Sequence, residues 1–136
     1  MRKVSVLIGT CMLVALALTL VAQAPQDLSP IMKDVGATSA SMRMNLMNNA
    51  AEDVAKDAAK LQQDFTQAQG FFKAMKAQDA VDAAKANADS AGEVMKAAKS
   101  GNLDAAKAPA AVIQKSCKAC HDVHREQLPD KTYKFK

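Results

Sequence analysis

The sequence predicts an all-α fold, an antiparallel up-down-up-down four-helix bundle. Alanine, lysine, glutamine and methionine, all good helix formers, dominate the chain. β-branched residues are scarce, and no segment alternates apolar and polar residues as a strand would. Capping residues, glycine and proline divide the chain after residue 28 into four helical pieces joined by short links. Helices of this number and spacing pack antiparallel to their neighbours by default.

The first two helices are defined by signals at their starts. Ser29 is expected to cap the first helix, with Pro30 at its first helical position, and the helix should run to about Asn48. The second helix is expected over residues 51–68. Gly70-Phe71-Phe72 then begins a looser connection, although these residues can also continue as helical turns.

The last two helices are bounded by caps. The third is expected over residues 79–100, with Asp79 as its N-cap and Gly101 closing it. Asn102 caps the fourth helix, which should end before Leu128-Pro129-Asp130.

Pro109 falls about seven positions into the fourth helix. A proline there removes a backbone donor and clashes with the preceding turn. The sequence therefore leaves two alternatives, a kink at Pro109 or a short helix that precedes the main one.

The N-terminus has the parts of a secretory signal. Met1-Arg2-Lys3 is basic, residues 4–21 are apolar apart from four small or hydroxylated residues, and Ala22-Gln23-Ala24 offers a signal-peptidase site. We expect a signal peptide over residues 1–24 and one domain over residues 25–136. The alternative is a membrane anchor, because the stretch approaches the roughly 18 to 20 apolar residues that span a bilayer. The signal predicts export to the periplasm.

Cys117-Lys118-Ala119-Cys120-His121 is a C-x-x-C-H motif, the attachment pattern for haem c. Thiols at i and i+3 lie on one face of a helix and can reach the two vinyl groups of one porphyrin edge. The histidine that follows can reach the iron. We therefore expect one covalently bound haem, near the C-terminal end of the last helix, whose iron carries the chemistry.

Other uses of the two cysteines fit less well. A redox disulfide of the thioredoxin type expects a β-α-β pattern, which the sequence lacks. A zinc site needs more ligands at close spacing, and the only histidines are His121 and His124. Cys11 lies inside the predicted signal and would leave with it.

The charge of the chain argues against nucleic acid as a partner. The full chain has 18 Lys and Arg against 14 Asp and Glu, a net charge of +4. Removing Arg2 and Lys3 with the signal leaves 16 against 14, a net charge of +2. The chain also has few of the aromatic residues on which bases stack, with no Trp, one Tyr and four Phe.

Bundle geometry identifies a candidate for the second axial ligand. The start of the first helix and the end of the fourth lie at one end of such a bundle. His121 is about six residues, or roughly 9 Å, from the expected end of its helix. Met32 lies at a matching height on the inner face of the first helix, whereas Met42 is roughly 15 Å further along. By geometry alone, Met32 is equally well explained as a ligand or as core packing.

The motif at residues 117–121, with Arg125 four residues after the histidine, resembles class II cytochrome c, the cytochrome c-prime family and its low-spin relatives. Ile31-Met32-Lys33-Asp34 is similar to the segment that holds the axial methionine in the low-spin branch. The resemblance extends from about Leu28 to the end of the chain. The chain departs from the family at His124, which stands where an aromatic residue usually precedes the arginine.

The resemblance implies a four-helix bundle with thioether bonds from Cys117 and Cys120. It also implies His121 as the proximal ligand of the iron and Met32 as the distal one. Arg125 is a candidate partner for a haem carboxylate, because a guanidinium matches a carboxylate fork; a solvated surface charge is nearly as good an explanation.

Several other residues have two interpretations each. His124 either packs beside the proximal ligand, bonds a haem carboxylate or faces solvent. Arg43 has the same two roles open as Arg125. Gly36 and Ser39 either let the first helix approach the porphyrin or are tolerated variation. The tail 131–136 is expected to pack near the haem edge rather than to steer an acidic partner.

Two functions compete. With both Met32 and His121 on the iron, the protein is not an enzyme but carries single electrons between periplasmic or membrane-bound redox proteins. With Met32 off the iron, a five-coordinate haem would bind nitric oxide or carbon monoxide for sensing, storage or detoxification. Peroxidase-type catalysis is weaker, because no distal acid–base pair is visible. Met44 and Met47, off the inner face, are a candidate homodimer contact through the first helix.

Overall fold

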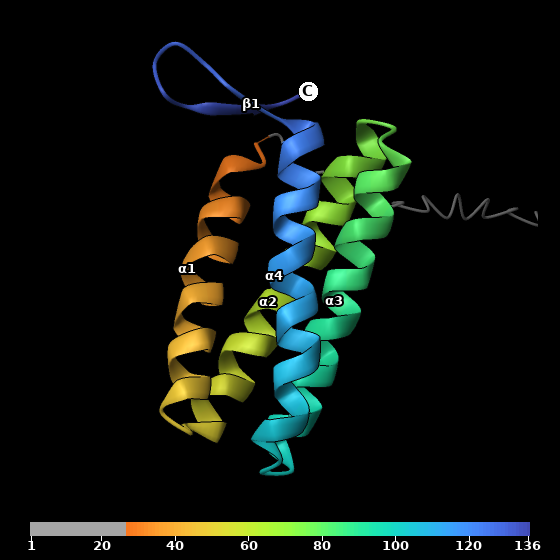
Figure 1. Ribbon diagram of the computed structural model, residues 1–136. Helices are drawn as coiled ribbons and strands as arrows, with labels where there is room; N and C mark the ends of the chain where they lie inside the picture. The colour runs from red at the N-terminus through yellow and green to blue at the C-terminus, as the bar shows by residue number, and fades with distance from the viewer. Residues whose placement is uncertain (1–26) are drawn as a thin grey trace, which may run out of the picture.

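A computed structural model describes residues 27–136, which form four helices that pack against one another (Figure 1). Each helix runs antiparallel to the one before it, so the predicted four-helix bundle is confirmed as an arrangement of helices. The predicted signal peptide, residues 1–24, lies outside the described residues. The helices are α1 (Ser29–Met47), α2 (Ala51–Ala74), α3 (Gln78–Lys99) and α4 (Leu103–His124).

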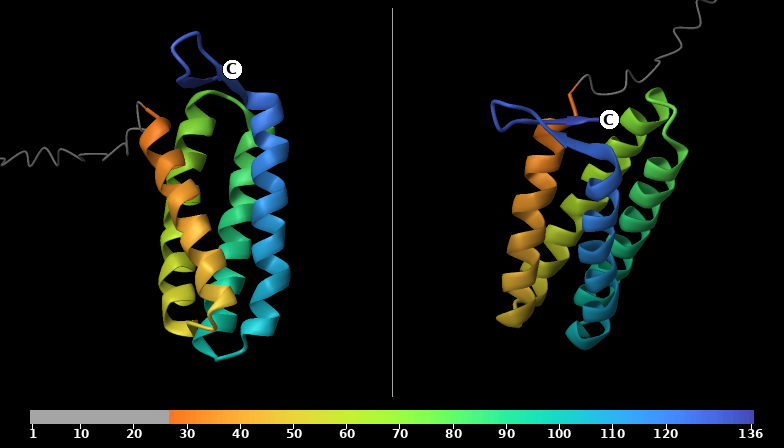
Figure 2. Two further views of the ribbon diagram at one scale, coloured as in Figure 1. Left: turned by 60° about the vertical axis from the view of Figure 1, so that its left-hand side comes forward. Right: turned by 45° about the horizontal axis from the view of Figure 1, so that its top comes forward.

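The C-terminal tail lies at one end of the bundle. The start of α1 and the end of α4 lie at the same end, where the C-terminal tail also sits (Figure 2). α2 and α3 share the most extensive interface, whereas α1 and α4 touch at only a few places. The side between α1 and α4 is therefore the loosely packed side of the bundle.

The core follows a heptad-like spacing, which is why the helices pack nearly parallel to a common axis. Buried residues recur every three or four positions along α2 and α3. Many are alanines, so the backbones can approach closely. The buried apolar residues of α2 are Val54, Ala55, Ala58, Leu61, Phe65, Ala68 and Phe72, and those of α3 are Ala80, Val81, Ala84, Ala88, Ala91, Val94 and Ala98.

All three turns between helices close in the same way. One residue of each adopts a left-handed backbone, namely Asn49 (φ 55°), Lys76 (φ 57°) and Gly101 (φ 73°). The next residue donates its N–H to a carbonyl five residues earlier, the 6→1 bond of a Schellman motif. These bonds run from Ala50 to Asn45 (2.9 Å), from Ala77 to Phe72 (3.1 Å) and from Asn102 to Ala97 (2.9 Å).

Two helices start earlier than predicted, and both predicted caps are wrong. Ser29 is already helical, and its N–H donates to the Asp27 carboxylate at 2.8 Å instead of Ser29 acting as the cap. α3 likewise begins at Gln78, with Ala77 rather than Asp79 at the capping position. In both cases the helix starts before the residue that local propensity favours, a common error of sequence-based boundaries.

The end predicted for the second helix is also wrong, because α2 continues to Ala74. Gly70 lies inside the helix, where it costs about 1 kcal/mol of helix propensity. Phe72 is 3% exposed and packs into the core. Burying a phenylalanine stabilises by about 1.5–3 kcal/mol, which outweighs the glycine.

The fourth helix begins as predicted. The side chain of Asn102 accepts the N–H of Ala105 at 3.1 Å, so the predicted N-cap is confirmed. Pro109 lies inside a single helix that runs from Leu103 to His124. The alternative of a separate short helix before Pro109 is therefore wrong.

The C-terminal tail forms a hairpin that the sequence did not reveal. β1 (Arg125–Gln127) pairs antiparallel with β2 (Tyr133–Phe135). The expectation that no segment forms a strand is therefore wrong, since three-residue strands are too short to show an alternating pattern. Phe135 packs against Phe71 and Phe72 with ring centroids 5.7 and 5.3 Å apart, which confirms that the tail packs onto the bundle.

No helix among residues 27–136 has the length and apolar character needed to cross a membrane.

Candidate functional site

A cavity of about 370 Å³ opens between α1 and α4, in the half of the bundle that holds the end of α4. This volume lies within the range typical of small-molecule and cofactor sites. All four helices contribute to its walls. The lining residues are Met32, Val35, Gly36, Ser39, Ala40, Arg43, Phe65, Phe72, Ala80, Ala83, Ala84, Asn87, Gln114, Cys117, Cys120 and His121.

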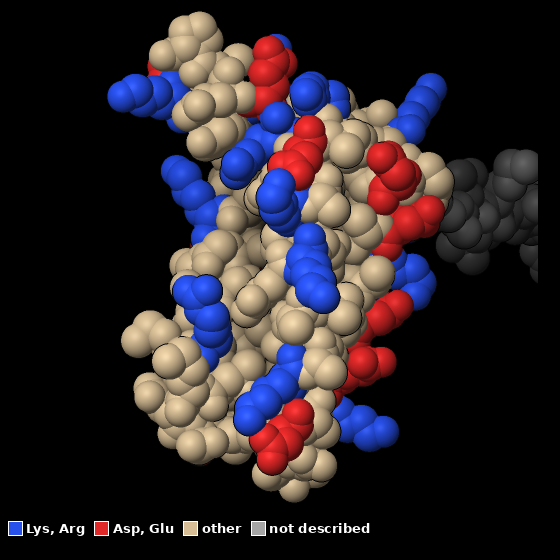
Figure 3. Space-filling model, viewed as in Figure 1, with Lys and Arg blue, Asp and Glu red and all other residues tan. Residues whose placement is uncertain are grey.

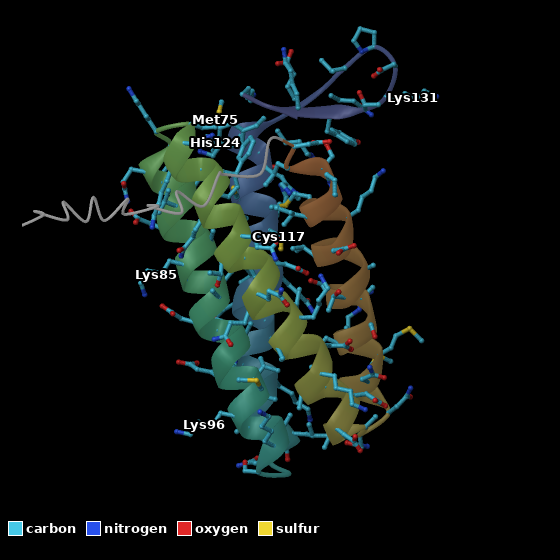
Figure 4. All side chains as sticks on the ribbon, turned by 180° about the vertical axis from the view of Figure 1, so that it is seen from behind. Met75, Lys85, Lys96, Cys117, His124 and Lys131 are labelled. Atoms are coloured by element: carbon cyan, nitrogen blue, oxygen red, sulfur yellow. The ribbon has the colours of Figure 1, made fainter. Side chains whose placement is uncertain are left out.

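Four of the predicted site residues lie around this one cavity. α4 contributes Cys117, Cys120 and His121, and α1 contributes Met32. Cys117 lies inside the bundle in the stick view of Figure 4, and its side chain packs against the core. Because Cys117 and Cys120 are three residues apart, both thiols lie on the same face of α4, which forms one wall of the cavity.

Both cysteines are free thiols rather than a disulfide. Burial raises the pKa of the Cys117 thiol above its ordinary value. Burial also raises the pKa of the Cys120 thiol, and the negative charges of Asp79 and Cys117 act in the same direction. At neutral pH both sulfur atoms therefore carry their protons, so the pair is not an activated redox centre of low thiol pKa.

The imidazole of His121 is held in its neutral form. Burial lowers the pKa of His121 below its ordinary value, and the positive charge of Arg125 lowers it further, while Asp122 opposes this change. The Asp122 carboxylate is also engaged elsewhere, since it accepts a bond from the Lys118 ammonium at 2.6 Å. A neutral imidazole offers a ring-nitrogen lone pair, which is the form that binds a metal.

His124 is turned away from the cavity. Its Nε2 lies 2.7 Å from a carboxylate oxygen of Asp79 on α3. Its Nδ1 lies 3.3 Å from the carbonyl of Lys136, and its ring stacks on Phe135 at 4.9 Å. The expected alternatives of packing beside His121 and of facing solvent are both wrong, because the His124 side chain is 15% exposed and its partners are Phe135 and Asp79. The hydrogen bond from His124 is also the main cause that lowers the pKa of Asp79.

The two candidate arginines lie in different places. The Arg125 guanidinium lies 4.3 Å above the ring of Tyr133 and does not line the cavity. Arg43 does line the cavity, from α1. Arg43 makes no salt bridge within residues 27–136, so its guanidinium is available to a carboxylate in the cavity.

The cavity has an apolar end and a polar end. Met32, Phe72 and His121 lie toward the end where α1 starts and α4 finishes. Arg43, Asn87 and Ser39 lie further along the bundle. The Asn87 Oδ1 and Ser39 Oγ atoms are buried and have no hydrogen-bond partner within the described residues. An unpaired buried polar atom costs about 1–3 kcal/mol, so this wall is not arranged for stability alone.

The sequence did not identify the walls contributed by α2 and α3. Phe65 and Phe72 stand seven residues apart on one face of α2, and Asn87 is 4% exposed. Asn87 was detectable in principle, because it interrupts the apolar positions of α3 with a polar residue at core spacing. Which face of α3 meets the cavity depends on the packing of all four helices, however.

The remaining methionines of α1 are not part of the cavity. Met42 is 1% exposed and belongs to the core below it. Met44 and Met47 are 61% and 76% exposed, in agreement with their predicted position off the inner face. The homodimer contact suggested for them stays a prediction.

A second hollow lies at the opposite end of the bundle, between α2 and the end of α3. It is lined by Glu52, Lys56, Lys99 and small residues, without a thiol, imidazole or thioether. No group of three or more His, Cys, Asp or Glu side chains that could hold a metal ion occurs within residues 27–136.

Comparison with known proteins gives no further assignment. No family model, no curated protein and no solved structure matches the chain.

Proposed function

We propose that the chain is a mono-haem c-type cytochrome that carries single electrons between periplasmic or membrane-bound redox proteins. One observation carries the proposal: two thiols and a neutral imidazole from α4, and a thioether from α1, face a single cavity of cofactor size. The C-x-x-C-H spacing and the resemblance to class II cytochrome c support the same assignment.

The residues present fit a haem c. Cys117 and Cys120 would hold it through thioether bonds, and protonated thiols at the cavity wall are the groups that add across vinyl groups. His121 and Met32, which line the cavity from α4 and α1, would hold the iron. Arg43 lines the same cavity and is better placed than Arg125 to pair with a haem carboxylate. The bound haem would supply a one-electron couple of iron.

The walls of the cavity would set the reduction potential of the haem iron. Phe65, Phe72 and the alanines of α3 make much of the cavity wall apolar. A thioether ligand and an apolar surrounding both favour the reduced, less charged state of the iron, which raises the reduction potential. Two protein ligands would leave no position free for a substrate, so the site suits electron transfer rather than catalysis.

The optical spectrum of the ferrous protein, with and without carbon monoxide, tests the proposal. A low-spin spectrum that carbon monoxide does not change is expected. Met32→Ala should open the site and make the spectrum sensitive to carbon monoxide, whereas Met44→Ala, on the exposed face of α1, should leave it unchanged.

Two outcomes would contradict the ligand assignment. A spectrum of the unaltered protein that shifts promptly with carbon monoxide would favour the gas-binding alternative. A Met32→Ala spectrum identical to that of the unaltered protein would exclude Met32 as a ligand.

A further inference from the structure

The charges of the chain are distributed unevenly over the bundle. α1, α4 and the tail, with the residues next to them, carry nine Lys and Arg against six Asp and Glu. α2, α3 and their connecting turn carry seven against eight. The positive charge of residues 27–136 is therefore concentrated on the side formed by α1 and α4, and Figure 3 shows that side with Lys and Arg side chains spread over it and a few Asp and Glu among them.

Helical spacing places Lys33, Lys115 and Lys118 next to cavity-lining residues of α1 and α4, whereas Lys107 lies about 10 Å further along α4. α4 carries a row of outward positions at intervals of three or four residues, and α1 carries Lys33 and Arg43 in one row with the cavity residues Gly36 and Ala40. We call the combined surface the basic face. It consists of Lys33, Arg43, Lys107, Lys115, Lys118 and Arg125.

The acidic residues next to the basic face leave part of its charge free. Asp104 neutralises Lys107 and Asp122 neutralises Lys118, each at 2.6 Å. Asp34, the acidic residue of α1, turns to Lys60 of α2 at 3.0 Å and so lies away from the mouth. Lys33 and Lys115 make no salt bridge within the described residues. The face therefore keeps exposed cations beside the cavity.

We infer that the basic face is the docking surface for an acidic, carboxylate-rich surface of a redox protein, which would bring its own redox centre to the mouth of the cavity. Charges at the rim of a contact mainly raise the rate of encounter and select the orientation of the partner. A second copy of this chain fits poorly there, because two basic faces would repel. The inference rests on the proposed electron-transfer function.

The first test needs no haem and measures only where the positive charge lies. Lys33→Gln/Lys115→Gln is compared with Lys85→Gln/Lys96→Gln, a control pair on α3 that protrudes from the opposite side of the bundle (Figure 4). Both variants have the same net charge. On a carboxylate cation-exchange resin, the basic-face variant should elute at clearly lower salt than the control. Elution at the same salt would show that the basic face does not direct binding.

The second test measures electron transfer with small probes of known charge. The ferrous protein gives one electron to hexacyanoferrate(III), an anion, or to tris(phenanthroline)cobalt(III), a cation; the haem iron becomes ferric and the probe metal is reduced by one unit. At about 10 mM ionic strength, Lys33→Gln/Lys115→Gln should slow the anion reaction several-fold and speed the cation reaction. The control pair should change both rates much less.

The outcomes separate the two proposals. A chain without haem would end the electron-transfer proposal, while the resin would still report on the basic face. A haem-loaded protein whose two variants react equally with each probe would overturn the docking surface alone. Tight binding of a single-stranded oligonucleotide at the same salt, lost in Lys33→Gln/Lys115→Gln, would replace the acidic protein with a nucleic acid and overturn the inference.

Discussion

Gly36 gives a prediction that separates an empty cavity from one filled by haem. It lies in the interior of α1 and lines the cavity, and a methyl group added there would meet no atom within 4 Å. Replacing an interior helix glycine by alanine stabilises by about 1 kcal/mol when nothing clashes. Gly36→Ala should therefore stabilise the haem-free chain by the full amount.

The magnitude can be converted into a melting temperature. A fold of 110 residues (27–136) has an unfolding entropy near 230 cal/mol/K, taken as about 2.1 cal/mol/K per residue, so about 1 kcal/mol raises Tm by about 4 °C. In the haem-loaded protein the same methyl group points into occupied space. Overpacking costs about 1–3 kcal/mol, so the gain should vanish or reverse.

Gly70→Ala is the matched control. Gly70 also lies inside a helix with nothing within 4 Å of the added methyl group, but it does not line the cavity. It should raise Tm by about the same amount in both forms. Thermal unfolding followed by circular dichroism, with Cys117→Ala/Cys120→Ala as the haem-free form, measures all four values. Equal stabilisation of both forms by Gly36→Ala would refute the placement of haem beside α1.

Two further predictions concern the apo chain. Asn102→Ala removes the acceptor of the Ala105 N–H and should lower the free energy of unfolding, measured in urea, by about 1 kcal/mol. The control Asn48→Ala, at the exposed C-terminal end of α1, should lower it much less. Equal losses of stability would exclude a capping role for Asn102. Burial raises the pKa of Cys117 and Cys120 above 9.0, so the folded chain keeps protons that the unfolded chain has released. The free energy of unfolding should therefore fall as pH rises above about 9, and Cys117→Ser/Cys120→Ser should remove this fall. A fall that persists in the double variant would contradict its assignment to the two thiols.

The helices could be predicted because their ends are marked locally. Asn102 and Gly101 define the turn before α4 by their own chemistry, and both predictions are confirmed. The end of α2 was predicted too early because local propensity at Gly70 does not register the burial of Phe72 in the core. The hairpin was missed for the same reason, since Phe135 is held by contacts with residues more than 60 positions away.

The candidate site, too, was only partly predictable from the sequence. The motif at residues 117–121 and the height of Met32 follow from helix rise and chain direction, which the sequence supplies. The contributions of Phe65 and Asn87 depend on how α2 and α3 are rotated about their axes, which only the packed bundle determines. His124 was open between three roles because its partner, Asp79, lies 45 residues away in the chain.

The mass and colour of the purified protein test the central claim most directly. The protein purified from a host that attaches haem c should be red, and its mass after denaturation should exceed that of the bare polypeptide by one haem. Cys117→Ser/Cys120→Ser should return the mass to that of the bare chain. A colourless product with the polypeptide mass would contradict the account.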